Sequence, residues 1–333
     1  MARSSPPPLW HPARAAFLAA AGAAAGLAGH RYLRAEGPQE PHLAARVATQ
    51  ALFINGINRT YTLVRPDKLP PNAPLVLALH GARANGVDMR QVTGYSLDRL
   101  AVDQGFAVIY PYGHGQTWND CRTQTPYPAR EDDIDDVRFL SQLVESVATA
   151  LDSDPARVFG FGYSNGGHML YRMAAEAPGI LAAMTVVSAN LPSLITTRCP
   201  PITRPTAIAL ITGTSDPVNP YRGGVGGTAL NRLDSVLSAE ATAAEFARIN
   251  GVDTTPVQTD VGIAPGQVWL TAYGDTSATP VRLYSVIGGG HTVPNPRYRA
   301  PRVLGATSRG IDAAMTAWTL FSYVGGYRPP GRR

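Results

Sequence analysis

Residues 160–168 read GFGYSNGGH, a cluster of glycines near the middle of the 333-residue chain that could serve two kinds of site. Glycine-rich turns cradle phosphates, and they also clear space around a single reactive serine. The dinucleotide fingerprint G-x-G-x-x-G needs its third glycine at position 165, where the chain has Asn165. A P-loop needs Gly-Lys-Ser/Thr, and the only lysine is Lys68. The cluster is therefore not a phosphate-binding loop.

The same residues match the pattern G-x-S-x-G at Gly162, Ser164 and Gly166. The strand-like residues 157–161 precede this pattern, and the helix-like residues 166–177 follow it. A serine on a sharp turn between a strand and a helix needs neighbours without side chains two positions before and two positions after it. The pattern and its setting predict that Ser164 is a nucleophile.

A serine hydroxyl is a weak nucleophile, so it requires a histidine base and a carboxylate that orients the base. Where the serine stands on such a turn, the acid and then the histidine follow along the chain, each after a later strand. His291 is the only histidine beyond the predicted helix, and it follows the strand-like residues 281–287. Asp216 follows an apolar strand, with Asp234 as the alternative acid. We expect Ser164, Asp216 and His291 to form a catalytic triad.

The remaining histidines are weaker candidates for the base. They lie in the N-terminal segment, at a strand end, in a loop or on the predicted helix: His11, His30, His42, His80, His114 and His168. The acidic residues 131–136 open a helix, where capping and the helix dipole explain them. An oxyanion hole needs two backbone N–H groups, which we expect from Asn165 and from Ala82 in the loop after the strand ending at His80.

Strand-like and helix-like segments alternate along the chain around this turn. The strand-like segments are 74–81, 106–110, 157–161, 182–187, 206–212 and 281–287; the helix-like segments are 91–104, 134–151, 166–177, 239–250 and 311–324. The strands are apolar without alternation, as in a parallel sheet buried on both faces. Residues 50–64 alternate around Asn55-Gly56, which predicts an antiparallel hairpin. The expected fold is α/β: a doubly wound, mostly parallel sheet with an antiparallel N-terminal hairpin.

The N-terminal segment has a basic lead followed by the uncharged residues 15–29. This stretch is short for a membrane span, which needs about 20 residues, and suits a signal-peptide core. Two arginines follow it and would hold an uncleaved anchor in place. We assign 1–29 to a signal peptide or signal anchor, 30–45 to a linker and 46–333 to one catalytic domain. The expected location is secreted or periplasmic, with membrane contact only through this segment.

Composition excludes several classes of partner. The formal net charge is +5, but eleven of the 29 basic residues lie near the two chain ends, which leaves a mildly acidic body and no basic face for nucleic acid. No His-x-x-x-His occurs and the two cysteines are far apart, so neither a metal nor a cofactor is expected. Cys121 and Cys199 could form a disulfide in an oxidising compartment or remain two unrelated thiols.

Six motifs, taken in order, resemble those of extracellular polyhydroxybutyrate depolymerases and of the related LpqC-type, feruloyl and acetylxylan esterases. They are LHGA at 79–82, YPYG at 110–113 with WND at 118–120, DDVxFL at 135–140, GYSNGG at 162–167, GTxDP at 213–217 and GGGHT at 288–292. The resemblance runs from about residue 52 to residue 318. It implies an exported serine esterase of the α/β-hydrolase fold, with Ser164 as nucleophile, Asp216 as acid and His291 as base.

The resemblance also implies that Trp118 lines the substrate cleft, and we place His80 on the substrate-binding side with it. Two stretches depart from the family pattern, ARAN at 82–85 and GGVGG at 223–227, and both are expected to border the cleft. The expected reaction is hydrolysis of a small or oligomeric carboxylic ester through an acyl-enzyme. Transfer of the acyl group to an envelope sugar is the alternative, followed by a non-catalytic binding protein on a hydrolase scaffold.

Overall fold

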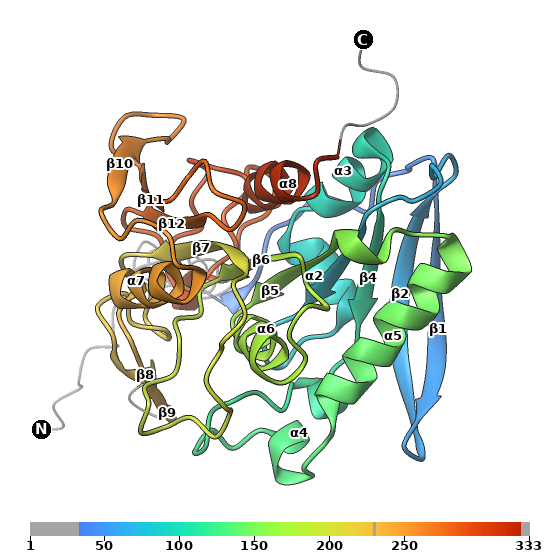
Figure 1. The fold of residues 1–333 in the computed structure, drawn as a ribbon, viewed down its shortest axis with the longest axis horizontal. Helices are drawn as coiled ribbons and strands as arrows, with labels where there is room; N and C mark the ends of the chain where they lie inside the picture. The colour runs from blue at the N-terminus through green and yellow to red at the C-terminus, as the bar shows by residue number, and fades with distance from the viewer. Residues whose placement is uncertain (1–32, 229–230, 328–333) are drawn as a thin grey trace, which may run out of the picture.

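A ten-stranded sheet forms the centre of the protein, in the order β1-β2-β4-β3-β5-β6-β7-β12-β11-β10 (Figure 1). The structure is a computed structural model that describes residues 33–228 and 231–327. Six neighbouring strands are parallel: β4 (Ala107–Pro111), β3 (Leu75–Leu79), β5 (Val158–Tyr163), β6 (Ala183–Val187), β7 (Ala207–Gly213) and β12 (Val281–Val286). Their carboxyl ends share one edge, where the sites of α/β sheets form.

Helices cover both faces of the sheet, which confirms the doubly wound α/β-hydrolase architecture (Figure 1). One face carries α5 (Asp136–Leu151), α6 (Asn165–Glu176) and α7 (Ala239–Asn250). The other carries α2 (Gly86–Val92), α3 (Ser96–Gln104) and α8 (Ala313–Val324). The remaining helical segments are short: η1 (His114–Gln116), α4 (Pro128–Glu131), η2 (Pro155–Arg157) and η3 (Arg302–Leu304).

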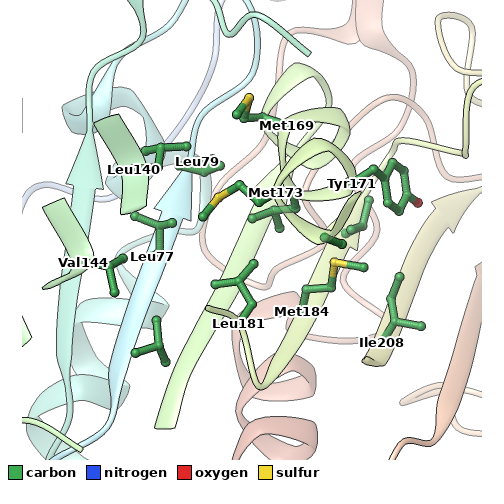
Figure 2. Packing of buried hydrophobic residues seen from close by; sticks show 14 of the residues in the cluster. Leu77, Leu79, Leu140, Val144, Met169, Tyr171, Met173, Leu181, Met184 and Ile208 are labelled. Carbon is green, nitrogen blue, oxygen red and sulfur yellow. The ribbon is translucent and has the colours of Figure 1, made fainter. Parts of the chain in front are cut away.

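The central strand β3 supplies side chains to both layers. Leu75, Leu77 and Leu79 face the layer of α5, α6 and α7, whereas Val76 and Ala78 face the opposite layer. Figure 2 shows Leu77 and Leu79 of β3 beside side chains of α5 and α6. All five residues are fully buried, and each leucine contributes roughly 2 kcal/mol of hydrophobic stabilisation. Burial on both faces explains why the strand reads as an unbroken apolar run.

The predicted N-terminal hairpin is confirmed, and it is longer than expected. Strands β1 (Ala45–Ile54) and β2 (Ile57–Pro66) pair antiparallel along their whole length. Asn55 and Gly56 between them both have positive φ, 50° and 79°. That combination defines the two-residue turn that matches the twist of the strands.

The helix predicted over 91–104 is wrong as a single element. The chain breaks between α2 and α3, where Gly94 and Tyr95 have φ of 61° and 57°. A Cβ on Gly94 would lie 2.8 Å from the side-chain oxygen of Asn295. The turn therefore packs directly against the segment that contains Asn295. Packing against a segment far away in the sequence therefore causes the break between the two helices, and the hydrophobic pattern of residues 91–104 does not predict it.

Four strands were not predicted: β8, β9, β10 and β11. The sheet continues beyond β12 with β11 (Val268–Tyr273) and β10 (Val257–Asp260), both antiparallel, so its second edge is antiparallel as well. All four residues of β10 are exposed. Outside the sheet, β8 (Gly224–Thr228) and β9 (Asn231–Val236) form a separate hairpin from the glycine-rich stretch that departs from the family pattern.

Cys121 and Cys199 form a disulfide with a Cα–Cα distance of 5.2 Å. This settles the alternative that the sequence left open. The bond ties the loop after β4 to the loop after β6, on the side of the sheet that carries α6.

The predicted signal peptide or anchor, residues 1–29, lies outside the described residues. Among the residues that the structure does describe, no helix is long and apolar enough to cross a membrane. Part of the predicted linker is held in place: the backbones of Glu36 and Arg299 exchange hydrogen bonds of 2.9 and 2.7 Å, and Glu40 pairs with Arg90. The division at residues 29 and 45 stays a prediction.

Candidate active site

Ser164 stands on a sharp turn between β5 and α6, at the carboxyl edge of the parallel strands. Its backbone has φ 53° and ψ −118°, a strained conformation that costs about 1–3 kcal/mol in residues other than glycine. A Cβ on Gly162 would lie 2.6 Å from the carbonyl oxygen of Gly166. A Cβ on Gly166 would lie 2.3 Å from the carbonyl oxygen of Leu79. Only glycine at both positions lets the turn close this tightly.

Two short hydrogen bonds connect Ser164 to a histidine and a carboxylate. Ser164 Oγ lies 2.8 Å from His291 Nε2, and His291 Nδ1 lies 2.8 Å from Asp216 Oδ2. The other carboxylate oxygen, Oδ1, accepts the backbone N–H groups of Val218 and Asn219 at 2.8 Å each. These bonds fix the orientation of the carboxylate. The structure thus brings together the three residues expected to form the triad, which we call the relay.

Close backbone contacts bring the two loops of the relay together. Strands β7 and β12 are parallel neighbours, and Asp216 and His291 follow their ends. A Cβ on Gly213 would lie 2.2 Å from the carbonyl oxygen of Gly289. The loop of His291 is held by its own backbone, because the His291 N–H donates to Leu304 at 2.6 Å and its carbonyl accepts the Tyr163 hydroxyl at 2.7 Å.

Ser164 and His291 line a cavity of about 690 Å³. That volume lies within the usual range for small-molecule sites. Much of its wall is apolar or aromatic, including Tyr127, Tyr163, Val218, Leu233, Tyr298 and Leu304. Both stretches that depart from the family pattern border it, since Arg83 and Gly227 also line the wall.

The two backbone amides expected to bind an oxyanion belong to Ala82 and Asn165. Ala82 lies in the cavity wall, and Asn165 is the first residue of α6, directly after Ser164. Within the described residues, neither amide donates a hydrogen bond. Unsatisfied N–H groups at the start of a helix favour an anion.

His80 is correctly placed at the end of β3, but it does not contact the cavity. Its side chain is fully buried, with Nδ1 2.7 Å from the carbonyl oxygen of Gly81 and Nε2 accepting the N–H of Gly113 at 2.9 Å. Burial lowers the pKa of His80 to about 4, so the ring is neutral and donates from Nδ1. The Gly81 carbonyl and the Ala82 N–H belong to one planar peptide and point in opposite directions. His80 therefore aims the Ala82 amide.

Trp118 is also fully buried and does not line the cavity, which corrects the prediction that it contacts substrate. Its indole Nε1 donates to the carbonyl oxygen of His80 at 2.9 Å. Its backbone N–H donates to Asn165 Oδ1 at 2.8 Å, and its carbonyl accepts Asn165 Nδ2 at 3.0 Å. One residue thus holds both segments that carry the candidate amides. We call His80, Trp118 and the Asn165 side chain the cradle.

A buried ion pair contacts the cradle through the side chain of Asn165. Asn165 Nδ2 donates to Asp120 Oδ2 at 2.6 Å, and Asp120 pairs with Arg122 through bonds of 2.6 to 3.2 Å. Burial by itself would raise the pKa of Asp120, but the Arg122 guanidinium outweighs it and holds that pKa below its usual value. Asp120 therefore stays a carboxylate that accepts from Asn165. This pair was not predicted from the sequence, although the WND motif contains its acid.

Asp234, the alternative acid, is not part of the relay. Its buried carboxylate accepts hydrogen bonds from backbone and hydroxyl groups of residues 123–125 and so ties β9 to that loop. In the acidic stretch 131–136, Asp135 caps α5 by accepting the Arg138 N–H at 3.0 Å, as the capping explanation requires. Within residues 33–228 and 231–327, no group of three or more His, Cys, Asp or Glu is placed to hold a metal ion.

The chain is similar to named esterases over most of its length. NocK of Nocardia uniformis subsp. tsuyamanensis, which carries the name of an esterase, is 30% identical over 295 residues, covering 84% of this chain and 83% of that protein. Feruloyl esterase B of Piromyces equi and poly(3-hydroxyalkanoate) depolymerase C of Paucimonas lemoignei are each 26% identical. They match 66% and 69% of this chain, which spans only 39% and 57% of their lengths.

Among solved structures, an acetyl xylan esterase from Aspergillus awamori superposes with a TM-score of 0.53 at 21% identity, over 74% of this chain and 95% of the other. At that identity the likeness shows a common fold. The chain matches no protein-family model.

Proposed function

The chain belongs to the family of α/β-hydrolase esterases that includes NocK, and we propose that it cleaves carboxylic esters through an acyl-enzyme on Ser164. The family membership confirms the expected class, a serine carboxylic-ester hydrolase. One observation carries the mechanism: a chain of two 2.8 Å hydrogen bonds ends at a serine in a strained turn that borders the large cavity.

In this mechanism His291 Nε2 takes the proton of Ser164 Oγ as that oxygen attacks the ester carbonyl. Asp216 binds the opposite ring nitrogen, which keeps Nε2 free to act as a base and stabilises the imidazolium that forms. The Ala82 and Asn165 amides receive the negative charge on the carbonyl oxygen. The proton then passes from His291 to the leaving alcohol, and the acyl group stays on Ser164.

The wall of the cavity indicates the class of substrate. Aromatic and aliphatic side chains fit an acyl group with an apolar or aromatic body, and about 690 Å³ admits a small ester or the end of an oligomer. Hydroxyalkanoate oligomers and feruloyl or acetyl esters are the substrates we propose, in keeping with the names of the relatives. An acyltransferase would use the same relay with an alcohol in place of water.

We also propose that the protein works outside the cytoplasm. The Cys121–Cys199 disulfide supports an oxidising compartment, because such bonds persist in secreted and periplasmic proteins and are rare in the cytosol.

The test compares Ser164→Ala with the wild type on a nitrophenyl butyrate ester, and then on hydroxybutyrate oligomers and on feruloyl and acetyl sugars. We expect the variant to lose about 10⁶-fold in kcat while its circular dichroism and Tm stay close to those of the wild type. Full activity in a folded Ser164→Ala protein would refute the assignment.

A further inference from the structure

A second, much smaller cavity also borders Ser164 and His291 of the relay. This chamber has a volume of about 10 Å³ and is lined by Ser164 and His291 together with residues that do not reach the large cavity, among them His168, Ser188 and Asn219. Ser164 and His291 therefore separate two spaces of very different size. The larger one suits an ester, and the smaller one has about the room that a single water molecule needs.

Two of the residues that line the chamber each carry a buried polar atom without a hydrogen-bond partner among the described residues. His168 is 3% exposed and its Nδ1 has no partner among the described residues; Asn219 is 4% exposed and the same holds for its Nδ2. A buried polar atom without a partner is destabilising, because it has lost its hydrogen bonds to water. Two such atoms on one small space indicate a ligand that satisfies both.

The chemistry of the two atoms selects the ligand. The amide oxygen of Asn219 accepts the Asn190 N–H at 3.2 Å, which identifies the atom without a partner as Nδ2, and an amide nitrogen only donates. Burial and the nearby Arg122 guanidinium hold the pKa of His168 well below its usual range, so its ring is neutral and offers one nitrogen as an acceptor. With the ring proton on Nε2, His168 Nδ1 is the acceptor, and a ligand between the two atoms accepts one hydrogen bond and donates another. Water does both, and an alcohol is too large for the volume.

We propose that the chamber holds one water molecule between His168 and Asn219, and that this water hydrolyses the acyl group on Ser164. The inference rests on the proposed function and deepens it, because it favours hydrolysis over acyl transfer. An alcohol acceptor has to enter through the large cavity, whereas the water molecule is already bound in the chamber next to Ser164 and His291. His168 and Asn219 are positioning residues in this scheme.

Hydrolysis of the acyl-enzyme needs only the water molecule, His291 and Ser164. The water oxygen attacks the acyl carbonyl carbon while His291 Nε2 takes one water proton. The bond between that carbon and Ser164 Oγ then breaks, and the proton passes from Nε2 to Oγ. The products are the free carboxylic acid and the original serine, and bulk water refills the chamber.

The first test is a high-resolution crystal structure of the full wild-type chain. Density for a water within hydrogen-bond distance of both His168 Nδ1 and Asn219 Nδ2 is the expected result. A dry chamber, or an ion in place of water, overturns the proposal. This measurement holds even if every variant below fails to fold.

The second test follows acylation and deacylation separately by stopped flow, with methanol added as a competing acceptor. His168→Phe keeps a ring of similar shape without nitrogens, and we expect deacylation to slow about tenfold while the initial burst of nitrophenol is unchanged. The ratio of methyl ester to free acid rises by about the same factor. His168→Asn places an amide near the position of Nδ1 and restores most of the rate.

Thr185→Val is the matched control, because it removes a fully buried hydroxyl that also has no partner among the described residues but does not line the chamber. It leaves the product ratio unchanged. An unchanged product ratio in His168→Phe refutes the chamber, and so does an equal loss of acylation and deacylation. A wild type without any burst refutes the acyl-enzyme instead, so the two failures are distinguishable.

Discussion

The relay and the cradle meet at Ser164 and its neighbour Asn165, but they are built differently. The relay consists of three side chains that follow the ends of β5, β7 and β12, and two of them line the large cavity. The cradle is fully buried, does not line the large cavity and is closed by hydrogen bonds between the end of β3, the loop at Trp118 and α6. Side chains that transfer protons must reach the substrate, whereas those that aim backbone amides need only be rigid.

The largest loss of activity is expected from a change in the relay. Asp216→Asn should lower kcat about 10⁴-fold, because an amide in place of the carboxylate favours the wrong histidine tautomer. Steady-state kinetics with a nitrophenyl ester measures this loss. Asp234→Asn is the control: it weakens the bonds to residues 123–125 and lowers Tm, but it spares the tautomer. A larger kcat loss in Asp234→Asn than in Asp216→Asn would reverse the choice of acid.

The second variant changes the turn at Ser164, where the relay and the cradle meet. Gly166→Ala puts a Cβ 2.3 Å from the Leu79 carbonyl oxygen, which cannot move without shifting β3. We expect kcat/KM to fall about 10²-fold through misplacement of Ser164, and Tm to fall with it. Gly325→Ala is the matched control, since its Cβ comes no closer than 3.0 Å to any atom. Unchanged kinetics in Gly166→Ala would mean that the turn tolerates a wider shape.

The third variant loosens the cradle and leaves the relay intact. Trp118→Phe keeps the backbone bonds to Asn165 and removes the indole bond to the His80 carbonyl, so kcat should fall about tenfold with KM unchanged. The affinity for a boronic acid that mimics the tetrahedral intermediate should fall by the same factor.

Trp318→Phe serves as the control for that variant, because it removes an indole bond to Gln104 far from the relay. If Trp118→Phe raises KM and leaves affinity for the boronic acid unchanged, then Trp118 acts on substrate binding and the cradle is not its role.

The smallest effect on activity is expected at the disulfide. Replacing Cys121 and Cys199 by alanine opens a loop of 78 positions and should lower the free energy of unfolding by about 4 kcal/mol. Urea unfolding measures that loss. Because neither cysteine bonds to the cradle or the relay, kcat should stay near the wild-type value wherever the variant is folded. A kcat loss larger than that of Trp118→Phe would place the disulfide among the supports of the cradle.

The parts that sequence analysis anticipated share a local cause. The glycines around Ser164 are required by one turn, and the apolar runs of β3 and β7 reflect burial on both faces. Asp216 and His291 could be found because parallel strands end at one edge, so chain order alone brings their loops near each other. The strand β10 could not be found, since all four of its residues are exposed and leave no hydrophobic pattern.

Trp118 is the clearest example of a residue whose position could not be predicted from the sequence. A tryptophan in a loop is equally compatible with a cleft wall and with the core, and only its bonds to His80 and Asn165, 38 and 47 positions away in the chain, decide that it is buried. The same holds for His168 and Asn219, which read as an ordinary helical histidine and a loop asparagine until the fold puts both on one small chamber.

By itself, the sequence determined the strand–serine–helix turn, the order of acid and base and the class of fold, because each depends on residues close together or on the common edge of parallel strands. Only the tertiary structure decided the burial of Trp118, the disulfide, the second antiparallel edge and the two spaces beside Ser164. Those features arise from contacts between segments far apart in the chain, and no local pattern of side chains encodes such contacts.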